Sequence, residues 1–185
     1  NGLPYDECGK VVVALTPDEL PRLEAIHRKA VANGVPDVEM IDAGRLREIE
    51  PNCVGLRALY SPRTAIVSYG QIAERMAQEI EQRGGTIVLN ATVRRIDERG
   101  EQVQVELQGG QVHPELFDAA IACSGLQSDR LARQSGDAAT PRIVPFFGQY
   151  YVIDERYKSH VKGLIYPVPD PRFPFLGVHF TKRID

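Results

Sequence analysis

The sequence predicts a mixed α/β (α+β) fold, in which helices accompany a mostly antiparallel sheet. β-Branched apolar runs alternate with segments whose apolar residues recur at helical spacing. Three runs of alternating polar and apolar residues, separated by glycine turns, indicate a β-meander. A run of apolar and small residues, 117–123, passes at Ser124-Gly125 directly into a polar segment that is compatible with a helix.

The N-terminal third begins with a strand and two helices. A β-branched run predicts a strand within residues 7–15. Thr16 then has the spacing of a capping box, with Pro17 at the first helical position and Glu19 at the third. Asn33-Gly34 ends this helix. A second, short helix is expected after Asp42, which is its cap candidate, and Pro51 ends it.

The middle of the chain combines strands with one long helix. A helix is predicted over 71–83, because Ile72, Met76, Ala77 and Ile80 form an apolar stripe at helical spacing and Gly84-Gly85 ends the pattern. Short apolar or alternating runs predict strands at 56–60, 65–69, 86–90, 92–98, 102–108 and 111–113. The last three of these form the expected meander.

The segment 117–130 suggests the edge of a nucleotide site. Its apolar part predicts a strand at 118–123, buried on both faces, with Cys123 as a small buried residue. A short helix to about 134 follows, and backbone N–H groups at a helix N-terminus bind phosphate well. The chain lacks the G-x-G-x-x-G fingerprint, so an ordinary turn that binds nothing remains an alternative.

The C-terminal region holds the densest group of candidate site residues. Strands are expected at 142–153, 163–168 and 175–181. Tyr166 stands before a proline-rich turn, while His179 alternates with apolar residues and shares its face with Thr181. Prolines on both sides would hold these side chains in a fixed geometry. A hairpin with a structural histidine is the alternative.

Composition and motifs exclude several classes. A net charge of −3 without basic runs argues against a nucleic-acid partner. No apolar run approaches the roughly 20 residues that span a bilayer. The three cysteines have no metal-ligand spacing, and no metal site is expected. A P-loop, a nucleophile elbow and an H-E-x-x-H motif are all missing.

Several short motifs, in collinear order over nearly the whole chain, carry a family resemblance. They are CGK at 8–10, IVSY at 66–69, CSGL at 123–126 with DR at 129–130, PF at 145–146 with Gly148 and Tyr150, YPVPDP at 166–171, and GVH at 177–179. Together they resemble the L-2-hydroxyglutarate oxidase/dehydrogenase family, which belongs to the flavin-dependent group typified by D-amino-acid oxidase.

This resemblance implies a partial FAD-binding domain with a β-meander, interleaved with a substrate domain. Residues 1–68 and 138–185 would be parts of the substrate domain, and residues 69–137 part of the FAD-binding domain. The sequence starts at Asn1 and stops at Asp185 without a turn signal, so we expect an internal part of a longer protein. FAD is expected in that full-length protein and absent from the isolated chain.

The resemblance also implies an activity: oxidation of L-2-hydroxyglutarate, or a similar 2-hydroxy acid, to the 2-oxo acid by hydride transfer to flavin. His179 is the candidate base, because imidazole titrates near working pH. The candidate substrate-binding residues are Tyr69, Tyr150, Tyr166 and Thr181. By resemblance, Val93, Ser124 and Gly125 would lie near the cofactor. The electron acceptor would be oxygen or a quinone.

Phe147 departs from the family, which usually has Pro-Phe-Arg-Gly where this chain has Pro-Phe-Phe-Gly. An arginine could bind a carboxylate with two hydrogen bonds, and phenylalanine cannot. Oxidation of an amine, an amino acid or glycerol 3-phosphate therefore remains an alternative, as does a non-catalytic binding module. The expected location is the cytoplasm, with peripheral association with the inner membrane left open.

Overall fold

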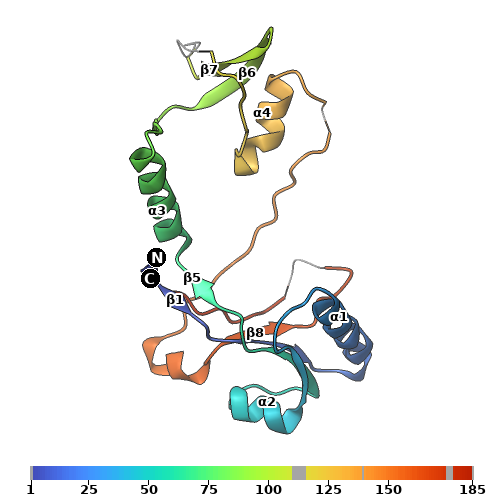
Figure 1. Cartoon of the computed structure of the whole chain (residues 1–185). Helices are drawn as coiled ribbons and strands as arrows, with labels where there is room; N and C mark the ends of the chain where they lie inside the picture. The colour runs from blue at the N-terminus through green and yellow to red at the C-terminus, as the bar shows by residue number, and fades with distance from the viewer. Residues whose placement is uncertain (1, 110–115, 139, 174–176, 185) are drawn as a thin grey trace. The chain divides into compact units, whose positions relative to one another are not determined.

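A computed structural model describes residues 2–109, 116–138, 140–173 and 177–184 (Figure 1). The chain divides into two compact units, one formed by Asn1–Glu79 with Gly148–Asp185 and the other by Ile80–Phe147. Each unit combines helices with antiparallel strand pairs. The predicted mixed α/β fold class is therefore confirmed.

The first unit is built on a four-stranded sheet with the order β3-β4-β2-β8. Its strands are β2 (Lys10–Ala14), β3 (Glu39–Asp42), β4 (Arg57–Ser61) and β8 (Leu164–Pro167). The pairs β3–β4 and β4–β2 are antiparallel, and β8 is parallel to β2. A separate antiparallel pair joins β1 (Tyr5–Asp6) to β5 (Ile66–Val67). The sheet is mostly antiparallel, as predicted.

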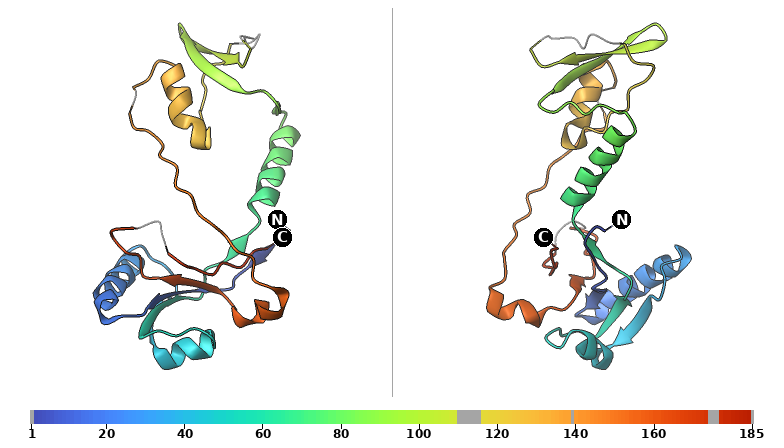
Figure 2. Two further views of the ribbon diagram at one scale, coloured as in Figure 1. Left: turned by 180° about the vertical axis from the view of Figure 1, so that it is seen from behind. Right: turned by 60° about the vertical axis from the view of Figure 1, so that its left-hand side comes forward.

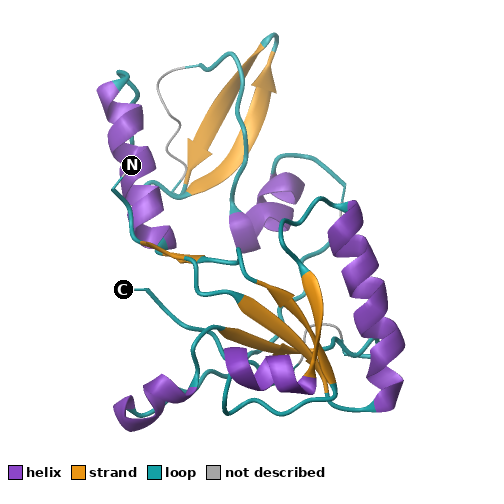
Figure 3. Ribbon diagram, turned by 60° about the horizontal axis from the view of Figure 1, so that its bottom comes forward, coloured by secondary structure: helices purple, strands orange, loops and turns teal. Residues whose placement is uncertain are grey.

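Helices α1 (Leu20–Ala32) and α2 (Ala43–Ile49) cover the two faces of this sheet (Figure 3). Leu23 of α1 is buried in a cluster with Ala14, Leu59 and Val168. Leu46 of α2 is buried in a second cluster, with Val11, Val13, Ile41 and Ala58. Successive residues of a strand point to opposite faces, so β2 contributes to both clusters.

The predicted helix caps are present. Glu19, at the end of a 3₁₀ turn (Pro17–Glu19), accepts hydrogen bonds from the backbone N–H groups of Leu15 (2.6 Å) and Thr16 (3.1 Å). Asp42 accepts from the backbone N–H of Arg45 at 2.8 Å and so caps α2. Local sequence signals thus fix where both helices begin.

A buried carboxylate connects α2 to the start of β8. Glu50, at the end of α2, is 1% exposed. Its oxygens accept from the backbone N–H groups of Lys162 (3.0 Å) and Gly163 (2.5 Å). These bonds satisfy the carboxylate inside the protein, where an unpartnered charge would be costly. Glu50 therefore holds the chain where it enters β8.

In the second unit, a hairpin packs with a short helix (Figure 2). The hairpin consists of β6 (Val93–Arg99) and β7 (Gln102–Leu107), and the helix is α4 (Ser128–Gln134). Both hairpin strands and α4 were predicted. The third strand of the meander, at 111–113, lies outside the described residues. Helix α3 (Tyr69–Gln82), also predicted, runs from the first unit into the second.

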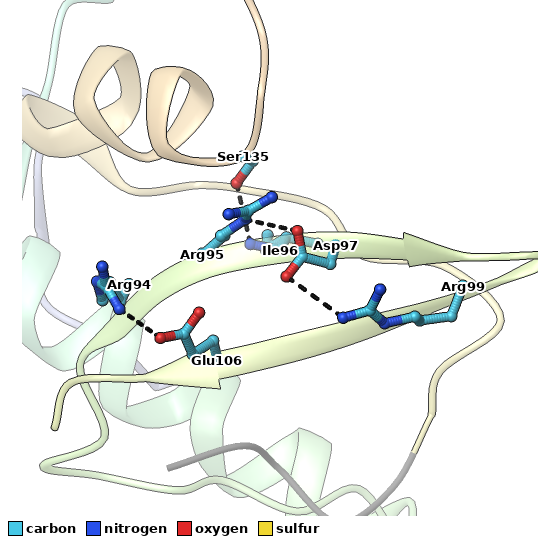
Figure 4. A network of polar contacts seen from close by, with 7 residues as sticks. All are labelled: Arg94, Arg95, Ile96, Asp97, Arg99, Glu106 and Ser135. Carbon is cyan, nitrogen blue, oxygen red and sulfur yellow. Dashed lines mark hydrogen bonds and ion pairs between the residues drawn. The ribbon is translucent and has the colours of Figure 1, made fainter. Parts of the chain in front are cut away.

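Charged pairs line the hairpin (Figure 4). Arg94 on β6 pairs with Glu106 on β7, at 2.5 Å. Asp97 contacts two arginines of its own strand, Arg95 at 2.5 Å and Arg99 at 3.9 Å. The hydroxyl of Ser135, after α4, accepts from the backbone N–H of Ile96 at 2.9 Å. Most of the charged side chains are half-exposed or exposed and contribute little to stability. The Ser135 contact and the buried Leu131 of α4 hold the helix against the hairpin.

Several strand predictions are wrong or too long. Residues 86–90, 118–123 and 142–153 form no strand, and β5 covers only two residues of the expected 65–69. In the last expected strand, 175–181, Phe180 makes a single antiparallel bridge to Ile165, and residues 174–176 lie outside the description. A strand needs a hydrogen-bonding neighbour, and in the described parts of the chain no strand pairs with residues 86–90, 118–123 or 142–153.

Two burial predictions are also wrong. Ile121 is 89% exposed and Cys123 is exposed, because the chain leaves the hairpin after the bridge between Phe117 and Val103 and the hydrogen bond from Gln102 to Asp118. In the apolar stripe of α3, Ile72 and Ala77 are half-buried, whereas Met76 and Ile80 are 61% and 49% exposed. Strand β3 was not predicted, because its four residues end at Asp42, the cap of the next helix, and were assigned to the segment that precedes this helix.

Candidate functional site

Strand β8 and the segment beside it bring four of the predicted site residues together. Ile165 and Phe180 exchange two backbone hydrogen bonds, of 3.1 and 2.9 Å. This antiparallel bridge places His179 opposite Tyr166, and Thr181 shares the face of His179. Tyr150 reaches the same group by ring contact with His179. We call Tyr150, Tyr166, His179 and Thr181 the tyrosine–histidine cluster.

The contacts within the cluster are close. The rings of Tyr166 and His179 are stacked, with centroids 4.6 Å apart and planes at 25°. Tyr150 meets His179 edge-on, with centroids 6.1 Å apart at 84°. The hydroxyl groups of Tyr166 and Thr181 are hydrogen-bonded at 3.2 Å. His179 is half-buried and Tyr150 is 80% exposed, so the cluster is open to a ligand.

The backbone selects the tautomer of His179. Its Nδ1 lies 3.0 Å from the carbonyl oxygen of Gly177. A carbonyl oxygen only accepts hydrogen bonds, so Nδ1 is the donor. In the neutral ring the other nitrogen, Nε2, then carries a free lone pair. His179 can accept a proton at Nε2 while its ring stays oriented by Gly177.

Lys10 joins the cluster, although the sequence did not single it out as a site residue. On β2, Lys10 and Val12 share one face, and Val12 is in register with Tyr166. The ammonium group of Lys10 consequently lies 3.9 Å from the centre of the Tyr166 ring. The sequence offered one signal for Lys10: it belongs to the CGK motif and stands two residues before Val12, on the same face of the strand.

Tyr69 is not joined to this cluster. It is the first residue of α3 and is 81% exposed. Within the described parts of the chain, no hydrogen bond or ring contact connects it to Tyr150, Tyr166 or His179. Its predicted role in substrate binding stays a prediction.

The three predicted cofactor residues lie in the second unit. Val93 is the first residue of β6 and is 38% exposed. Ser124 and Gly125 form a turn before α4, in which Ser124 is half-buried and Gly125 is exposed with a φ of +54°. A Cβ added at Gly125 would meet no atom within 4 Å. The backbone of this turn is thus open to close approach, which fits a cofactor passing beside it.

Neither half-buried thiol is activated. Burial raises the pKa of Cys8, with the Asp6 carboxylate adding to the effect. Burial also raises the pKa of Cys53, together with Glu50. A raised pKa keeps the thiol protonated and weakly nucleophilic.

The described residues form neither a cluster of metal ligands nor a helix that could span a membrane. No three of their histidine, cysteine, aspartate and glutamate side chains gather as metal ligands. None of the helices formed by these residues is both long and apolar enough to cross a bilayer.

The family described as FAD dependent oxidoreductase (DAO) matches residues 1–185. The chain belongs to this family. It is 45% identical over 185 residues to the mitochondrial L-2-hydroxyglutarate dehydrogenase of Caenorhabditis elegans, covering 99% of this chain and 43% of that protein. It is 40% identical over 186 residues to the L-2-hydroxyglutarate dehydrogenase of Escherichia coli K12, covering 100% and 43%. The resemblance inferred from the motifs is confirmed.

A solved structure supports the fold. The dithionite-reduced L-α-glycerophosphate oxidase of Mycoplasma pneumoniae, with FAD bound, superposes with a TM-score of 0.75 at 19% identity. The superposition covers 91% of this chain and 45% of that one. Our chain therefore spans less than half the length of the proteins it matches.

Proposed function

We propose that this chain is part of an FAD-dependent enzyme that oxidises L-2-hydroxyglutarate to 2-oxoglutarate. The observation that carries the proposal is the tyrosine–histidine cluster, in which His179 has a free Nε2 beside two hydroxyl groups. It is supported by the family match and by 40–45% identity to L-2-hydroxyglutarate dehydrogenases. No comparable identity favours an amine, an amino acid or glycerol 3-phosphate as substrate.

Oxidation of the C2 alcohol removes a hydride from C2 and a proton from the hydroxyl group, which leaves a C2 carbonyl. When bound, FAD supplies the acceptor for the hydride. His179 takes the hydroxyl proton at Nε2, while its Nδ1–H bond to Gly177 keeps the ring in place. The hydroxyl groups of Tyr166 and Thr181 orient the substrate by hydrogen bonds. Tyr150 would close the cluster from the edge of the His179 ring.

In this proposal the substrate domain includes residues 1–68 and 138–185, and the FAD-binding domain includes residues 69–137. Val93, Ser124 and Gly125 would hold FAD, as the family resemblance implies. The substrate is a small 2-hydroxy acid, and the electron acceptor is oxygen or a quinone. The cytoplasmic location, with or without peripheral contact to a membrane, stays a prediction from the sequence.

Anaerobic mixing of the full-length protein with L-2-hydroxyglutarate tests the proposal. We expect the visible absorption of bound flavin to bleach and 2-oxoglutarate to form in equal amount. The D enantiomer is the matched control, because it has the same charge and composition and presents its C2 hydrogen in the wrong direction. Bleaching by a primary amine or by glycerol 3-phosphate, without bleaching by L-2-hydroxyglutarate, would contradict the proposal.

A further inference from the structure

Lys10 carries a positive charge beside the cluster without a carboxylate partner. Its ammonium group lies over the Tyr166 ring, at 3.9 Å from the centroid. Among the residues that the structure describes, no acidic side chain forms an ion pair with it. By contrast, Lys182 of the neighbouring segment pairs with Asp6 at 2.8 Å. A half-exposed cation–π contact is weaker than a hydrogen-bonded ion pair, so Lys10 is available to an anionic ligand.

The order of the strands places Lys10 and His179 on opposite sides of Tyr166. Strand β8 pairs with β2 on one edge and bridges Phe180 on the other. Lys10 extends from β2 and His179 from the segment beyond β8, and both contact the Tyr166 ring. A ligand that reaches both groups must therefore extend across this ring.

We infer that Lys10 binds the carboxylate of the substrate that is distal to the reacting carbon, and so selects a dicarboxylate. This inference rests on the proposed function, which places the C2 hydroxyl at His179. The C1 carboxylate is bonded directly to C2 and stays beside His179. The C5 carboxylate lies at the far end of the carbon chain, where it can cross Tyr166 to Lys10. This chain has Phe147 where the family usually has an arginine, and phenylalanine cannot bind a carboxylate. Lys10 provides a positive charge that can.

The test compares a dicarboxylate with a monocarboxylate in the full-length, FAD-loaded protein. In Lys10→Met the apolar stem is kept and the charge is lost. We expect kcat/KM for L-2-hydroxyglutarate to fall by about 10- to 100-fold, and kcat/KM for L-2-hydroxypentanoate to stay within about threefold. Calorimetric titration should show the same selective loss, for glutarate and not for pentanoate. Lys10→Arg should retain most of the preference.

Lys29→Met, on the exposed surface of α1, is the matched control, because it removes the same charge away from the cluster. Lys10→Gln repeats the test with a polar side chain in case Lys10→Met does not fold. Equal losses for both substrates, or a loss for neither, would overturn the inference. If the unsubstituted protein fails to oxidise L-2-hydroxyglutarate at all, the proposed function fails instead, and glutarate binding alone then decides the role of Lys10.

Discussion

At the scale of single residues, the position of His179 follows from one backbone bridge. The Ile165–Phe180 bridge fixes its ring against Tyr166, and the Gly177 carbonyl fixes its tautomer. The sequence could indicate the period-two face shared by His179 and Thr181. It could not indicate the stacking partner, because residues 166 and 179 meet only through a pairing that no local pattern encodes. Lys10 was missed, although its CGK motif was visible, because its contact with Tyr166 depends on the pairing of β2 with β8.

His179→Gln in the full-length protein should lower the rate of flavin reduction by L-2-hydroxyglutarate by roughly 10²-fold or more. Glutamine keeps a polar side chain of similar reach but cannot accept a proton near neutral pH. Stopped-flow absorbance under anaerobic conditions measures this rate. His160→Gln, on the 3₁₀ helix Glu155–His160, is the control and should leave the rate unchanged. A His179 variant within a few-fold of the unsubstituted protein would rule out the base assignment.

Asp170, in the proline-rich turn after β8, has a perturbed carboxyl group. Hydrogen bonds from the Arg172 guanidinium, and then from the Arg172 backbone N–H, lower the pKa of Asp170 to about 2. Because the pKa of Asp170 is lower in the folded state than in the unfolded state, where it is about 4, the ionised carboxylate stabilises the fold at pH values above about 4. This contribution is lost as the pH falls towards 2. The pair is exposed, so the contribution is small.

The carboxyl-carbon chemical shift of Asp170, followed by NMR, should titrate with a midpoint near 2. In Arg172→Ala the midpoint should rise towards about 4, because the guanidinium bonds are lost. Asp154 serves as the control, since Arg156 lowers its pKa by the same kind of contacts and is unchanged in this variant. An unchanged Asp170 midpoint in Arg172→Ala would show that the ion pair does not form in solution.

At the scale of elements, prediction succeeded where the signals were local. The capping box at Thr16, the Asp42 cap and the glycine turn of the β6–β7 hairpin all involve residues a few positions apart. It failed for the apolar runs at 118–123 and 142–153, whose strand character depends on a neighbour elsewhere. The parallel pairing of β8 with β2 could not be predicted either, because the two strands are far apart in the sequence and hydrophobic periodicity does not indicate pairing partners.

The β2–β8 pairing depends on the absence of a side chain at Gly163. A Cβ there would lie 2.5 Å from the Cys8 carbonyl oxygen and 2.9 Å from that of Gly9. Both are backbone atoms and cannot move without shifting β2. Gly163→Ala should lower the free energy of unfolding by about 1–3 kcal/mol, as overpacking of a tight interior does.

Denaturant titration monitored by circular dichroism measures this effect. Gly70→Ala is the matched control: Gly70 lies in α3, and a Cβ there would meet nothing within 4 Å. Since alanine favours a helix over glycine by roughly 0.5–1 kcal/mol, this control should be neutral or slightly stabilising. Equal stability of the two variants would mean that β8 does not enter the sheet through this contact.

At the scale of the whole molecule, the candidate substrate-binding cluster and the candidate cofactor residues lie in different units of the chain. The tyrosine–histidine cluster belongs to the unit formed by Asn1–Glu79 with Gly148–Asp185, and the cofactor candidates belong to Ile80–Phe147. The interleaved organisation was expected from the family resemblance. The sequence of 185 residues contains no glycine fingerprint, the usual main contact to the diphosphate of a dinucleotide.

The isolated 185-residue chain should therefore bind FAD weakly and purify without colour. Backbone N–H groups of a glycine-rich turn carry most of the diphosphate interaction, and the turn at Ser124-Gly125, which lacks the glycine fingerprint, cannot replace them. Visible absorbance after addition of FAD and gel filtration measures retention, with the full-length protein as the positive control. Stoichiometric retention by the isolated chain, lost in Gly125→Val, would instead make this turn the principal cofactor contact. Retention unaffected by Gly125→Val would place the flavin contact elsewhere in these residues.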